Sequence, residues 1–198
     1  DIYVNILGFN EKLININDLK LLGLHNIENV MAAIGISLCA NISIQNIKDV
    51  LLEFKGVPHR IEFVTSMNDI DYYNDSKGTN PDAAIKSIEA MRKPIVLIAG
   101  GYEKGSDFTE WINKFEGRVK HAVVMGEVKD RMCTSLIENG FHNFTKASTL
   151  EEAIEISNSI AQEGDCILLS PACASWDMFN NFEERGDLFK SIVLSLRR

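Results

Sequence analysis

Basic residues are scarce in this sequence. Its 198 residues include 20 Lys and Arg against 28 Asp and Glu, which gives a formal net charge of −8. Because contacts with nucleic-acid phosphates or anionic lipids need clustered Lys and Arg, we expect neither nucleic acid nor a membrane surface to be the main partner. No apolar run approaches the roughly 20 residues of a membrane-spanning helix, and the first residues do not resemble a signal peptide.

Cysteine is also rare. The four cysteines have no C-x-x-C spacing and no histidine at ligand spacing; they are Cys39, Cys133, Cys166 and Cys173. We therefore expect no disulfide framework and no zinc site, and a reducing, cytoplasmic location.

Three common catalytic and nucleotide-binding motifs are missing. No Gly-Lys pair occurs, so the phosphate-cradling pattern G-x-x-x-x-G-K-[ST] is absent, and so is the dinucleotide pattern G-x-G-x-x-G. No nucleophile elbow suggests covalent catalysis. Any nucleotide phosphate that this chain contacts must therefore be held by other means or by another part of a larger protein.

The most informative stretch covers residues 70–81. Residues 70–73 are β-branched, acidic and aromatic and predict a strand. Asn80 is a good N-cap and Pro81 suits the first position of a helix, where a missing N–H costs nothing. Between them lie a carboxylate, two hydroxyls and an ammonium at the carboxyl end of a strand, where open α/β sheets bind their ligands.

Two further polar loops follow apolar strands. Residues 100–107 come after the apolar run 95–99, and residues 170–177 come after the run 166–169. Because the carboxyl ends of parallel strands meet at one edge of a sheet, we expect all three loops to converge there.

From residue 61 onward the pattern alternates between strands and helices. Such alternation predicts an α/β fold with a doubly wound, mostly parallel, Rossmann-like sheet covered by helices on both faces. The expected strands cover residues 61–65, 70–73, 95–99, 122–125, around 144 and 166–169, and the expected helices 81–91, 108–115, 130–139, 150–161 and 182–196. Asp107 with Glu110, and Thr149 with Glu152, have the spacing of capping boxes.

The first 56 residues form a separate region. Residues 3–7 and 12–16 alternate apolar with polar around a Gly-Phe-Asn turn and predict a hairpin or two edge strands. Apolar stripes predict helices at residues 25–40 and after Ser43. Residues 56–60, which contain a proline and a basic pair, predict a hinge, so we divide the chain into 1–56 and 57–198.

Several polar side chains have more than one interpretation. Asp75 could accept hydrogen bonds from the hydroxyls of a ribose, or it could be an ordinary turn carboxylate. Lys77 and Lys104 could bind a ligand anion, or they could be solvated surface lysines. Thr79 and Ser175 could bind a ligand or merely cap a turn.

Five segments of the chain, taken in order, resemble one enzyme family. They are residues 23–29 (GLHNIEN), 56–60 (GVPHR), 74–80 (NDSKGTN), 100–108 (GGYEKGSDF) and 169–186. Together they cover nearly the whole chain and resemble the Mur ligases of bacterial cell-wall synthesis. The D-S-K-x-T-N form of the third segment is similar to the branch of that family that adds D-glutamate.

The resemblance implies a three-domain, ADP-forming ligase, with residues 1–56 as the end of a central ATP-binding domain and 57–198 as the C-terminal domain. Such ligases use ATP to phosphorylate the alanine carboxylate of UDP-N-acetylmuramoyl-L-alanine, and the amine of D-glutamate then attacks the acyl phosphate. The implied cofactors are ATP and Mg²⁺, with metal ligands mainly outside this chain. The resemblance also implies a cytoplasmic, monomeric enzyme. This chain alone would be inactive, because it lacks the phosphate-binding loop.

The resemblance assigns roles to ten residues. Asn26 and Asn29 would contact adenine, Arg60 the phosphates and Asp75 the ribose, while Lys77 would lie near the reacting phosphate as the catalytic residue. The residues expected to bind D-glutamate are Thr79, Lys104, Ser175, Trp176 and Phe182. Cations and hydrogen-bond donors suit a dianionic amino acid that must be aligned for attack.

Two other function classes remain open. One is a nucleotide- or amino-acid-binding module that catalyses nothing. The other is a folylpolyglutamate-type ligase, which usually has a histidine in the loop of Asp75, where this chain has Lys77 and Thr79 instead. The chain also departs from the family pattern at Gly78, where alanine is common, and at Trp176, where leucine or phenylalanine is usual.

Overall fold

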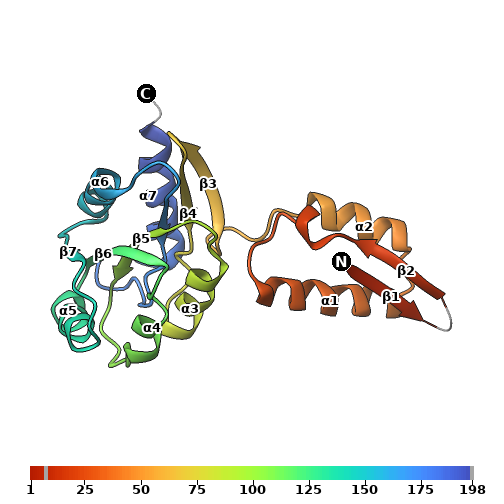
Figure 1. Cartoon of the computed structure of the whole chain (residues 1–198), viewed down its shortest axis with the longest axis horizontal. Helices are drawn as coiled ribbons and strands as arrows, with labels where there is room; N and C mark the ends of the chain where they lie inside the picture. The colour runs from red at the N-terminus through yellow and green to blue at the C-terminus, as the bar shows by residue number, and fades with distance from the viewer. Residues whose placement is uncertain (7–8, 197–198) are drawn as a thin grey trace. The chain divides into compact units, whose positions relative to one another are not determined.

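The chain divides into two compact units in a computed structural model that describes residues 1–6 and 9–196. The first unit is Asp1–Gly56 and the second is Val57–Arg198 (Figure 1). None of the helices in the described part of the chain has the length and apolar character needed to cross a bilayer.

The first unit combines a strand pair with two helices. β1 (Ile2–Ile6) runs antiparallel to β2 (Phe9–Ile14), and a short 3-10 helix at Ile16–Asp18 follows. α1 (Leu24–Cys39) and α2 (Ile44–Glu53) complete the unit. Its core consists of apolar side chains from both strands and both helices.

Both strands predicted for this unit are present with shifted bounds, and of the two predicted alternatives, a hairpin or two edge strands, the antiparallel pairing agrees with the hairpin. The second strand was predicted at residues 12–16 but covers Phe9–Ile14. It ends before Asn15 because Asn15 caps the 3-10 helix by accepting a hydrogen bond from the backbone N–H of Asn17 at 2.9 Å. Leu7 and Gly8, which belong to the predicted strand and turn, lie outside the described residues.

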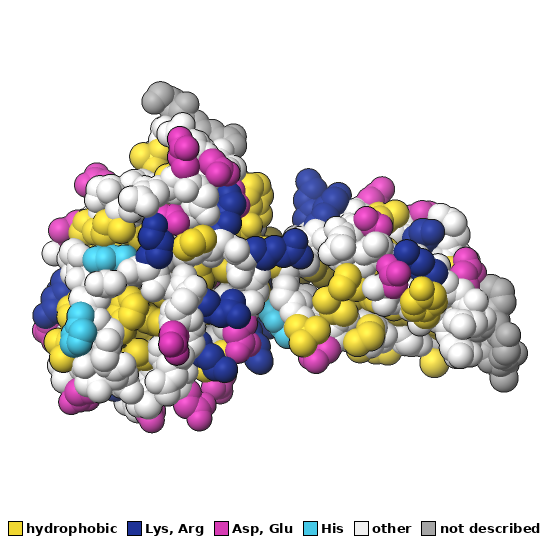
Figure 2. All heavy atoms as spheres, viewed as in Figure 1, with side chains coloured by type: hydrophobic (Ala, Val, Ile, Leu, Met, Phe, Trp, Pro, Cys, Tyr) yellow, Lys and Arg dark blue, Asp and Glu magenta, His cyan; other side chains and the backbone are white. Residues whose placement is uncertain are grey.

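The first unit exposes large apolar side chains on its helices. Figure 2 shows several apolar side chains together on the visible face of this unit. The exposed apolar residues of α1 and α2 and the residue after α2 include Leu24, Met31, Ile36, Val50 and Phe54. The predicted N-cap of α2 is confirmed, since Ser43 Oγ accepts a hydrogen bond from a backbone N–H at 3.2 Å.

The second unit is built on one six-stranded sheet. Its strands are β3 (Glu62–Met67), β4 (Ile70–Asn74), β5 (Ile95–Gly100), β6 (Val119–Met125), β7 (Phe144–Lys146) and β8 (Cys166–Leu169). They lie in the order β3-β4-β8-β5-β6-β7, with β3 antiparallel to β4 and every other neighbouring pair parallel. The predicted doubly wound, mostly parallel sheet is therefore confirmed, with one antiparallel edge strand.

Helices cover both faces of this sheet (Figure 1). They are α3 (Pro81–Ala90), α4 (Thr109–Asn113), α5 (Lys129–Glu138), α6 (Leu150–Ile160) and α7 (Phe182–Ser195). α6 and α7 pack on one face, where their apolar side chains form a core cluster with those of Val96, Ile98, Ile167 and Leu169. α3, α4 and α5 cover the opposite face. All six residues of β5 are buried, as expected of a central strand in a parallel sheet.

Two of the predicted helix starts have the expected caps. The side chain of Asn80 accepts a hydrogen bond from the backbone N–H three residues later at 2.9 Å. Thr149 Oγ1 accepts from the backbone N–H of Glu152 at 3.2 Å, and the carboxylate of Glu152 accepts from the backbone N–H of Ser148 at 2.6 Å. These reciprocal contacts satisfy backbone donors that a helix start leaves unpaired.

The capping box predicted for Asp107 and Glu110 is wrong. Phe108 occupies the N-cap position of α4 in a helical backbone conformation, and its side chain makes no capping hydrogen bond. Asp107 instead accepts a hydrogen bond from the backbone N–H of Thr109 at 2.9 Å. The helix begins at Thr109, one residue later than predicted, and the buried ring of Phe108 packs against Trp111.

Removing the buried side chain of Ile98 should destabilise the second unit strongly. Ile98 is 0% exposed at the centre of the sheet, so Ile98→Ala should lower the free energy of unfolding by about 2–5 kcal/mol. Urea unfolding followed by tryptophan fluorescence measures this unit alone, because both tryptophans of the chain, Trp111 and Trp176, belong to it.

Ile137→Ala is the matched control. Ile137 is 52% exposed on α5, so this change should alter the unfolding free energy by no more than about 0.5 kcal/mol. Equal losses for the two variants would show that β5 is not at the centre of the core.

Candidate active site

Three neighbouring strands of the sheet end at one edge. β4 and β5 both pair parallel with β8, which lies between them, so the loops after these three strands begin side by side. The convergence predicted from the sequence is therefore confirmed. The chain leaves β5 toward β6 but reaches β8 only after crossing back over the sheet, and such a reversal of strand order is where doubly wound sheets bind ligands.

The loop after β4 begins with a carboxylate that the fold encloses. Asp75 is 3% exposed, and its carboxylate accepts hydrogen bonds from Ser87 Oγ at 2.5 Å, from Ser170 Oγ at 2.9 Å and from the backbone N–H of Ile61 at 3.2 Å. Burial raises the pKa of Asp75 to about 6, and these three hydrogen bonds limit the rise. Asp75 therefore joins its own loop to α3, to the β8 loop and to the start of β3.

Gly78 allows this inward position of the carboxylate. A Cβ atom at residue 78 would overlap Asp75 Oδ2 and would lie 3.2 Å from Ser170 Oγ. Gly78, which replaces the alanine expected from the family resemblance, therefore lies where the loop is closely packed.

The two other predicted residues of this loop are less buried than Asp75. Lys77 is exposed, and its ammonium lies 5.5 Å from the centre of the Phe182 ring, within the range of a cation–π contact. Thr79 is half-buried and directly precedes Asn80, the N-cap of α3. The loop thus brings Lys77 next to Phe182, a residue more than a hundred positions later that was predicted for the same site.

The loop after β5 carries Lys104 toward the loop after β8. The ammonium of Lys104 lies 5.0 Å from the centre of the Trp176 ring, and Tyr102 lies beside the same ring at 5.8 Å. The backbone N–H of Tyr102 donates to the carbonyl of Ala174 at 2.9 Å. Lys104 and Trp176, both predicted for the amino-acid site, are therefore neighbours.

An ion pair supports the Lys104 loop from below. Arg131 on α5 donates to both carboxylate oxygens of Glu103, at 2.5 and 2.7 Å, and to the carbonyl of Ser106 at 2.9 Å. Its guanidinium also lies 4.7 Å from the centre of the Phe108 ring. These bidentate contacts fix the backbone on both sides of Lys104.

The loop after β8 contains one buried and one exposed predicted residue. Ser175 is 2% exposed, whereas Trp176 is 64% exposed. The carbonyl of Ser175 accepts hydrogen bonds from the backbone N–H groups of Met178 and Phe179 at 3.1 and 2.8 Å. This turn presents Trp176 to solvent above the Lys104 loop.

Arg185 is a buried cation to which the sequence analysis assigned no role. It is 0% exposed in the first turns of α7, and its guanidinium donates to Ser76 and to the carbonyl of Cys173. Burial lowers the pKa of Arg185 to about 10, so the side chain stays charged at neutral pH. An arginine in an otherwise polar helix start gives no signal in the sequence that it will be enclosed.

His59 was also missed. It is 7% exposed, its Nδ1 lies 3.1 Å from Asn74 Nδ2, and its ring meets the edge of Phe182 with ring centres 6.0 Å apart. A Cβ at Gly186 would overlap the His59 ring, so α7 approaches this histidine closely. The pair His59-Arg60 in the sequence was the available signal, but only Arg60, which is exposed, was assigned a role.

The predicted adenine contacts belong to the first unit. Asn26 and Asn29 lie in the first turns of α1, and the amide of Asn29 donates to Asn26 Oδ1 at 3.5 Å. Asn26 also donates to the carbonyl of Leu22 at 2.7 Å. The two asparagines are therefore neighbours on one helix.

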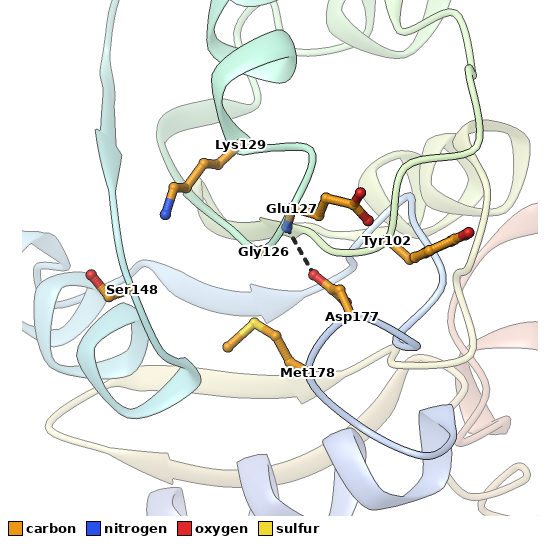
Figure 3. Close-up of a pocket in the computed structure, with 7 residues that line it drawn as sticks. All are labelled: Tyr102, Gly126, Glu127, Lys129, Ser148, Asp177 and Met178. Carbon is orange, nitrogen blue, oxygen red and sulfur yellow. Dashed lines mark hydrogen bonds between the residues drawn. The ribbon is translucent and has the colours of Figure 1, made fainter.

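A hollow of about 460 Å³ opens at the same edge of the sheet, beyond β6 (Figure 3). The residues that line it are Tyr102, Gly126, Glu127, Lys129, Ser148, Asp177 and Met178. Asp177 accepts a hydrogen bond from the backbone N–H of Glu127 at 2.9 Å. No group of three possible metal ligands occurs among residues 1–6 and 9–196, so the described part of the chain offers no ready metal centre.

Comparisons with known proteins identify the family. The family model for the Mur ligase, glutamate ligase domain, matches residues 59–173. The chain is 49% identical over its whole length to UDP-N-acetylmuramoylalanine–D-glutamate ligase of Thermoanaerobacter sp. (strain X514), and 50% identical over 94% of its length to the enzyme of the same name in Alkaliphilus metalliredigens. It spans 44% and 41% of those two relatives, less than half of each.

Solved structures show the same fold at low sequence identity. The UDP-N-acetylmuramate–alanine ligase of Thermotoga maritima superposes with a TM-score of 0.66 at 19% identity, over 90% of this chain and 40% of that protein. The folylpolyglutamate synthase of Mycobacterium tuberculosis, solved with ADP, gives 0.64 at 15% identity, over 86% and 41%. With the family model matching more than half of its residues, this chain belongs to the Mur ligase family and contains its glutamate ligase domain.

Proposed function

We propose that this chain is part of an ATP-dependent ligase that joins D-glutamate to UDP-N-acetylmuramoyl-L-alanine in peptidoglycan synthesis. The observation that carries the proposal is the identity of 49% over the full chain to a relative named as the D-glutamate ligase. Because the chain spans less than half of that relative, the activity belongs to a longer protein.

The proposed reaction forms an amide at the expense of ATP. The alanine carboxylate of the UDP-linked substrate takes the γ-phosphoryl group of ATP, which releases ADP and gives an acyl phosphate. The amine of D-glutamate attacks the acyl carbon, and the tetrahedral intermediate expels phosphate and loses a proton to give the amide. Aligning a dianionic nucleophile against an acyl phosphate is mainly a matter of positioning.

We propose that the crevice between the loops after β4, β5 and β8 binds D-glutamate. Lys104 is exposed next to Trp176, and Lys77 is exposed next to Phe182, so two cations border the place where the strand order reverses. The remaining proposed contacts are Thr79, Ser175, Trp176 and Phe182. The Lys104 ammonium and the hydroxyls of Thr79 and Ser175 would hold the two carboxylates of the amino acid, while Lys77 would lie near the reacting phosphate.

We propose that ATP binds mainly through residues outside this crevice. Asn26 and Asn29 would face the adenine, Arg60 the phosphates, and Lys77 the reacting phosphate. Mg²⁺ would be held by residues beyond the described ones, since no cluster of metal ligands occurs among those. Residues 1–56 would be the end of the ATP-binding domain, whose remaining residues would cover the exposed apolar side chains of α1 and α2.

The ribose contact proposed for Asp75 competes with its role inside the fold. Three internal donors already reach the carboxylate, and only 3% of the residue is exposed. A ribose-binding Asp75 would make its substitution weaken ATP more than an analogue without the 2′- and 3′-hydroxyls. A structural Asp75 would make both nucleotides weaken alike.

The proposed reaction also predicts the cellular compartment and the inactivity of the isolated chain. The cytoplasm is the proposed compartment, because ATP is available there. Without a phosphate-binding loop, the 198-residue chain alone would not catalyse the reaction.

A folylpolyglutamate-type ligase is the second candidate function. The solved folylpolyglutamate synthase at 15% identity supports only the fold.

Lys104→Ala in the full-length enzyme should weaken D-glutamate selectively. Losing one charge-assisted contact costs about 1.5–3 kcal/mol, so the KM for D-glutamate should rise roughly 10- to 150-fold while the KM for ATP stays nearly unchanged. Steady-state phosphate release with each substrate varied in turn measures both constants.

Lys86→Ala is the matched control, because Lys86 is an exposed lysine on α3 that pairs with Glu89 at 3.6 Å. It should leave both constants unchanged. Equal increases in the two KM values for Lys104→Ala, or none, would remove Lys104 from the amino-acid site. Absence of D-glutamate-dependent phosphate release from the unmodified enzyme would refute the proposed reaction.

Asp75→Asn should change the pH dependence of stability. The pKa of Asp75 is raised from 3.8 to about 6, so between about pH 4 and 6 the folded carboxyl keeps a proton that the unfolded carboxyl has lost. Its contribution to stability therefore falls as pH rises through this window, by about 3 kcal/mol in all. The substituted side chain of the Asp75→Asn variant stays neutral, so the free energy of unfolding of this variant should rise relative to that of the unmodified chain between pH 4 and 7.

Urea unfolding at several pH values, followed by tryptophan fluorescence, measures this difference. Asp130→Asn is the control, because the hydrogen bond from Lys146 lowers the pKa of the exposed Asp130. A lowered pKa gives stability that is lost as pH falls, so this variant should change in the opposite direction. A pH-independent difference for Asp75→Asn would show that Asp75 is ionised in the fold at all these pH values.

A further inference from the structure

The guanidinium of Arg185 is buried without an ion pair among the described residues. Its Nε donates to Ser76 Oγ at 2.9 Å and its Nη2 to the carbonyl of Ser76 at 2.8 Å. Nη1 and Nη2 also reach the carbonyl of Cys173, at 3.3 and 3.2 Å. All four contacts are to neutral oxygen atoms, and the carboxylates of Asp177 and Asp75 act on the guanidinium only from beyond ion-pair distance, where their attraction partly offsets the lowering of its pKa. Buried charges are normally paired, because desolvation is costly, so an unpaired one calls for a specific reason.

The two loops that Arg185 joins carry the proposed site. Ser76 directly precedes Lys77 in the loop after β4, and Cys173 lies two residues before Ser175 in the loop after β8. Beyond the ends of β4 and β8, one backbone hydrogen bond joins these two loops in the described residues. It runs from the backbone N–H of Asp75 to the carbonyl of Leu169. Among side chains, the hydrogen bond from Ser170 Oγ to Asp75 joins the loops at their bases, and the guanidinium joins them further along, at Ser76 and Cys173.

The loop after β5 also lies close to the Arg185 side chain. A Cβ at Gly101 would lie 3.3 Å from Arg185 Nη1 and would overlap the carbonyl of Ala174, so only glycine lets the loop after β5 approach so closely. From there the hydrogen bond between Tyr102 and Ala174 leads to Lys104. Arg185 therefore contacts or closely approaches all three loops of the crevice.

Ser76 extends the link to the start of α7. Its hydroxyl accepts from Arg185 and donates to the carbonyl of Phe182 at 2.7 Å. Phe182 in turn lies against the ammonium of Lys77 and against His59. Ser76 is 0% exposed, so these contacts lie in the interior of the protein and not on its surface.

We propose that Arg185 is a positioning residue that holds the loops after β4 and β8 at the spacing that the amino-acid ligand requires, acting through Lys77 and Ser175. The part of the inference that concerns ligand binding rests on the proposed function, whereas the part that concerns the loops does not. A guanidinium suits this task because its planar fork reaches several acceptors at once, whereas a lysine ammonium offers donors around one point.

Hydrogen exchange in the full-length protein tests the link between the loops. Ser76→Ala removes the hydroxyl that Arg185 and Phe182 share and leaves the arginine in place. The backbone N–H groups of residues 76–80 and 173–178 should both exchange at least 10-fold faster in this variant. Ser157→Ala is the matched control, because Ser157 is a serine that is also 0% exposed, bonded within α6 to the carbonyl of Ala153 at 2.7 Å. It should leave both loops unchanged.

Kinetics of the same variants separate positioning from general stability. Ser76→Ala should raise the KM for D-glutamate about 10-fold relative to that for ATP, whereas Ser157→Ala, even with a similar fall in melting temperature, should not. Arg185→Lys keeps the charge but loses the fork, so it should resemble Ser76→Ala if it folds.

Each outcome decides between the alternatives. Unchanged exchange in the 173–178 loop of Ser76→Ala, or the same exchange and KM changes in Ser157→Ala, would overturn the role of Arg185. Normal loop exchange and normal KM values in Arg185→Lys would show that the charge alone is enough and would also overturn it. If the unmodified full-length protein shows no D-glutamate-dependent phosphate release, the proposed reaction fails, while the exchange data still decide whether Arg185 links the loops.

Discussion

The parallel pairing of β8 with both β4 and β5 is the constraint on which the candidate site depends. It places three strand ends side by side, and each strand continues into a polar loop. The strands can supply this frame because their side chains are buried on both faces; every residue of β5 and β8 is buried. Such a rigid base lets short loops carry exposed lysines without a large entropic cost on binding.

Beneath the exposed lysines lies an interior that is unusually polar. Asp75 is enclosed by three donors, and Arg185 is enclosed by neutral acceptors on two loops. An apolar core would be cheaper to bury, but hydrogen bonds specify where each loop must lie, which apolar contacts do less well. The raised pKa of Asp75 and the lowered pKa of Arg185 both record the cost of this burial.

Much of the fold could be predicted from the sequence because its signals are local. Apolar runs located the central strands, and Asn80, Thr149 and Ser43 were recognised as N-caps. The capping box assigned to Asp107 failed because Phe108 occupies the N-cap position, and the Asp107 carboxylate accepts from the backbone N–H of Thr109 instead. The antiparallel β3 was not foreseen as such, because strand direction depends on pairing and not on local pattern.

The candidate site was only partly predictable, for a related reason. A polar residue after a strand can point outward, as Lys77 does, or into the fold, as Asp75 does, and the sequence pattern is the same in both cases. Arg185 and His59 are enclosed by elements that are distant in the chain, so no spacing reveals them. Position at a strand end identified the loops, whereas the roles of individual side chains within them needed the three-dimensional contacts.

A crystal structure of the full-length enzyme with D-glutamate and ADP tests the central claim most directly. The claim is that the crevice between the loops after β4, β5 and β8 binds the amino acid. We predict difference density for D-glutamate with one carboxylate within hydrogen-bonding distance of the Lys104 ammonium and the other near the loop of Lys77. Density in the hollow next to Lys129 and Ser148 instead, with the crevice empty, would contradict the account.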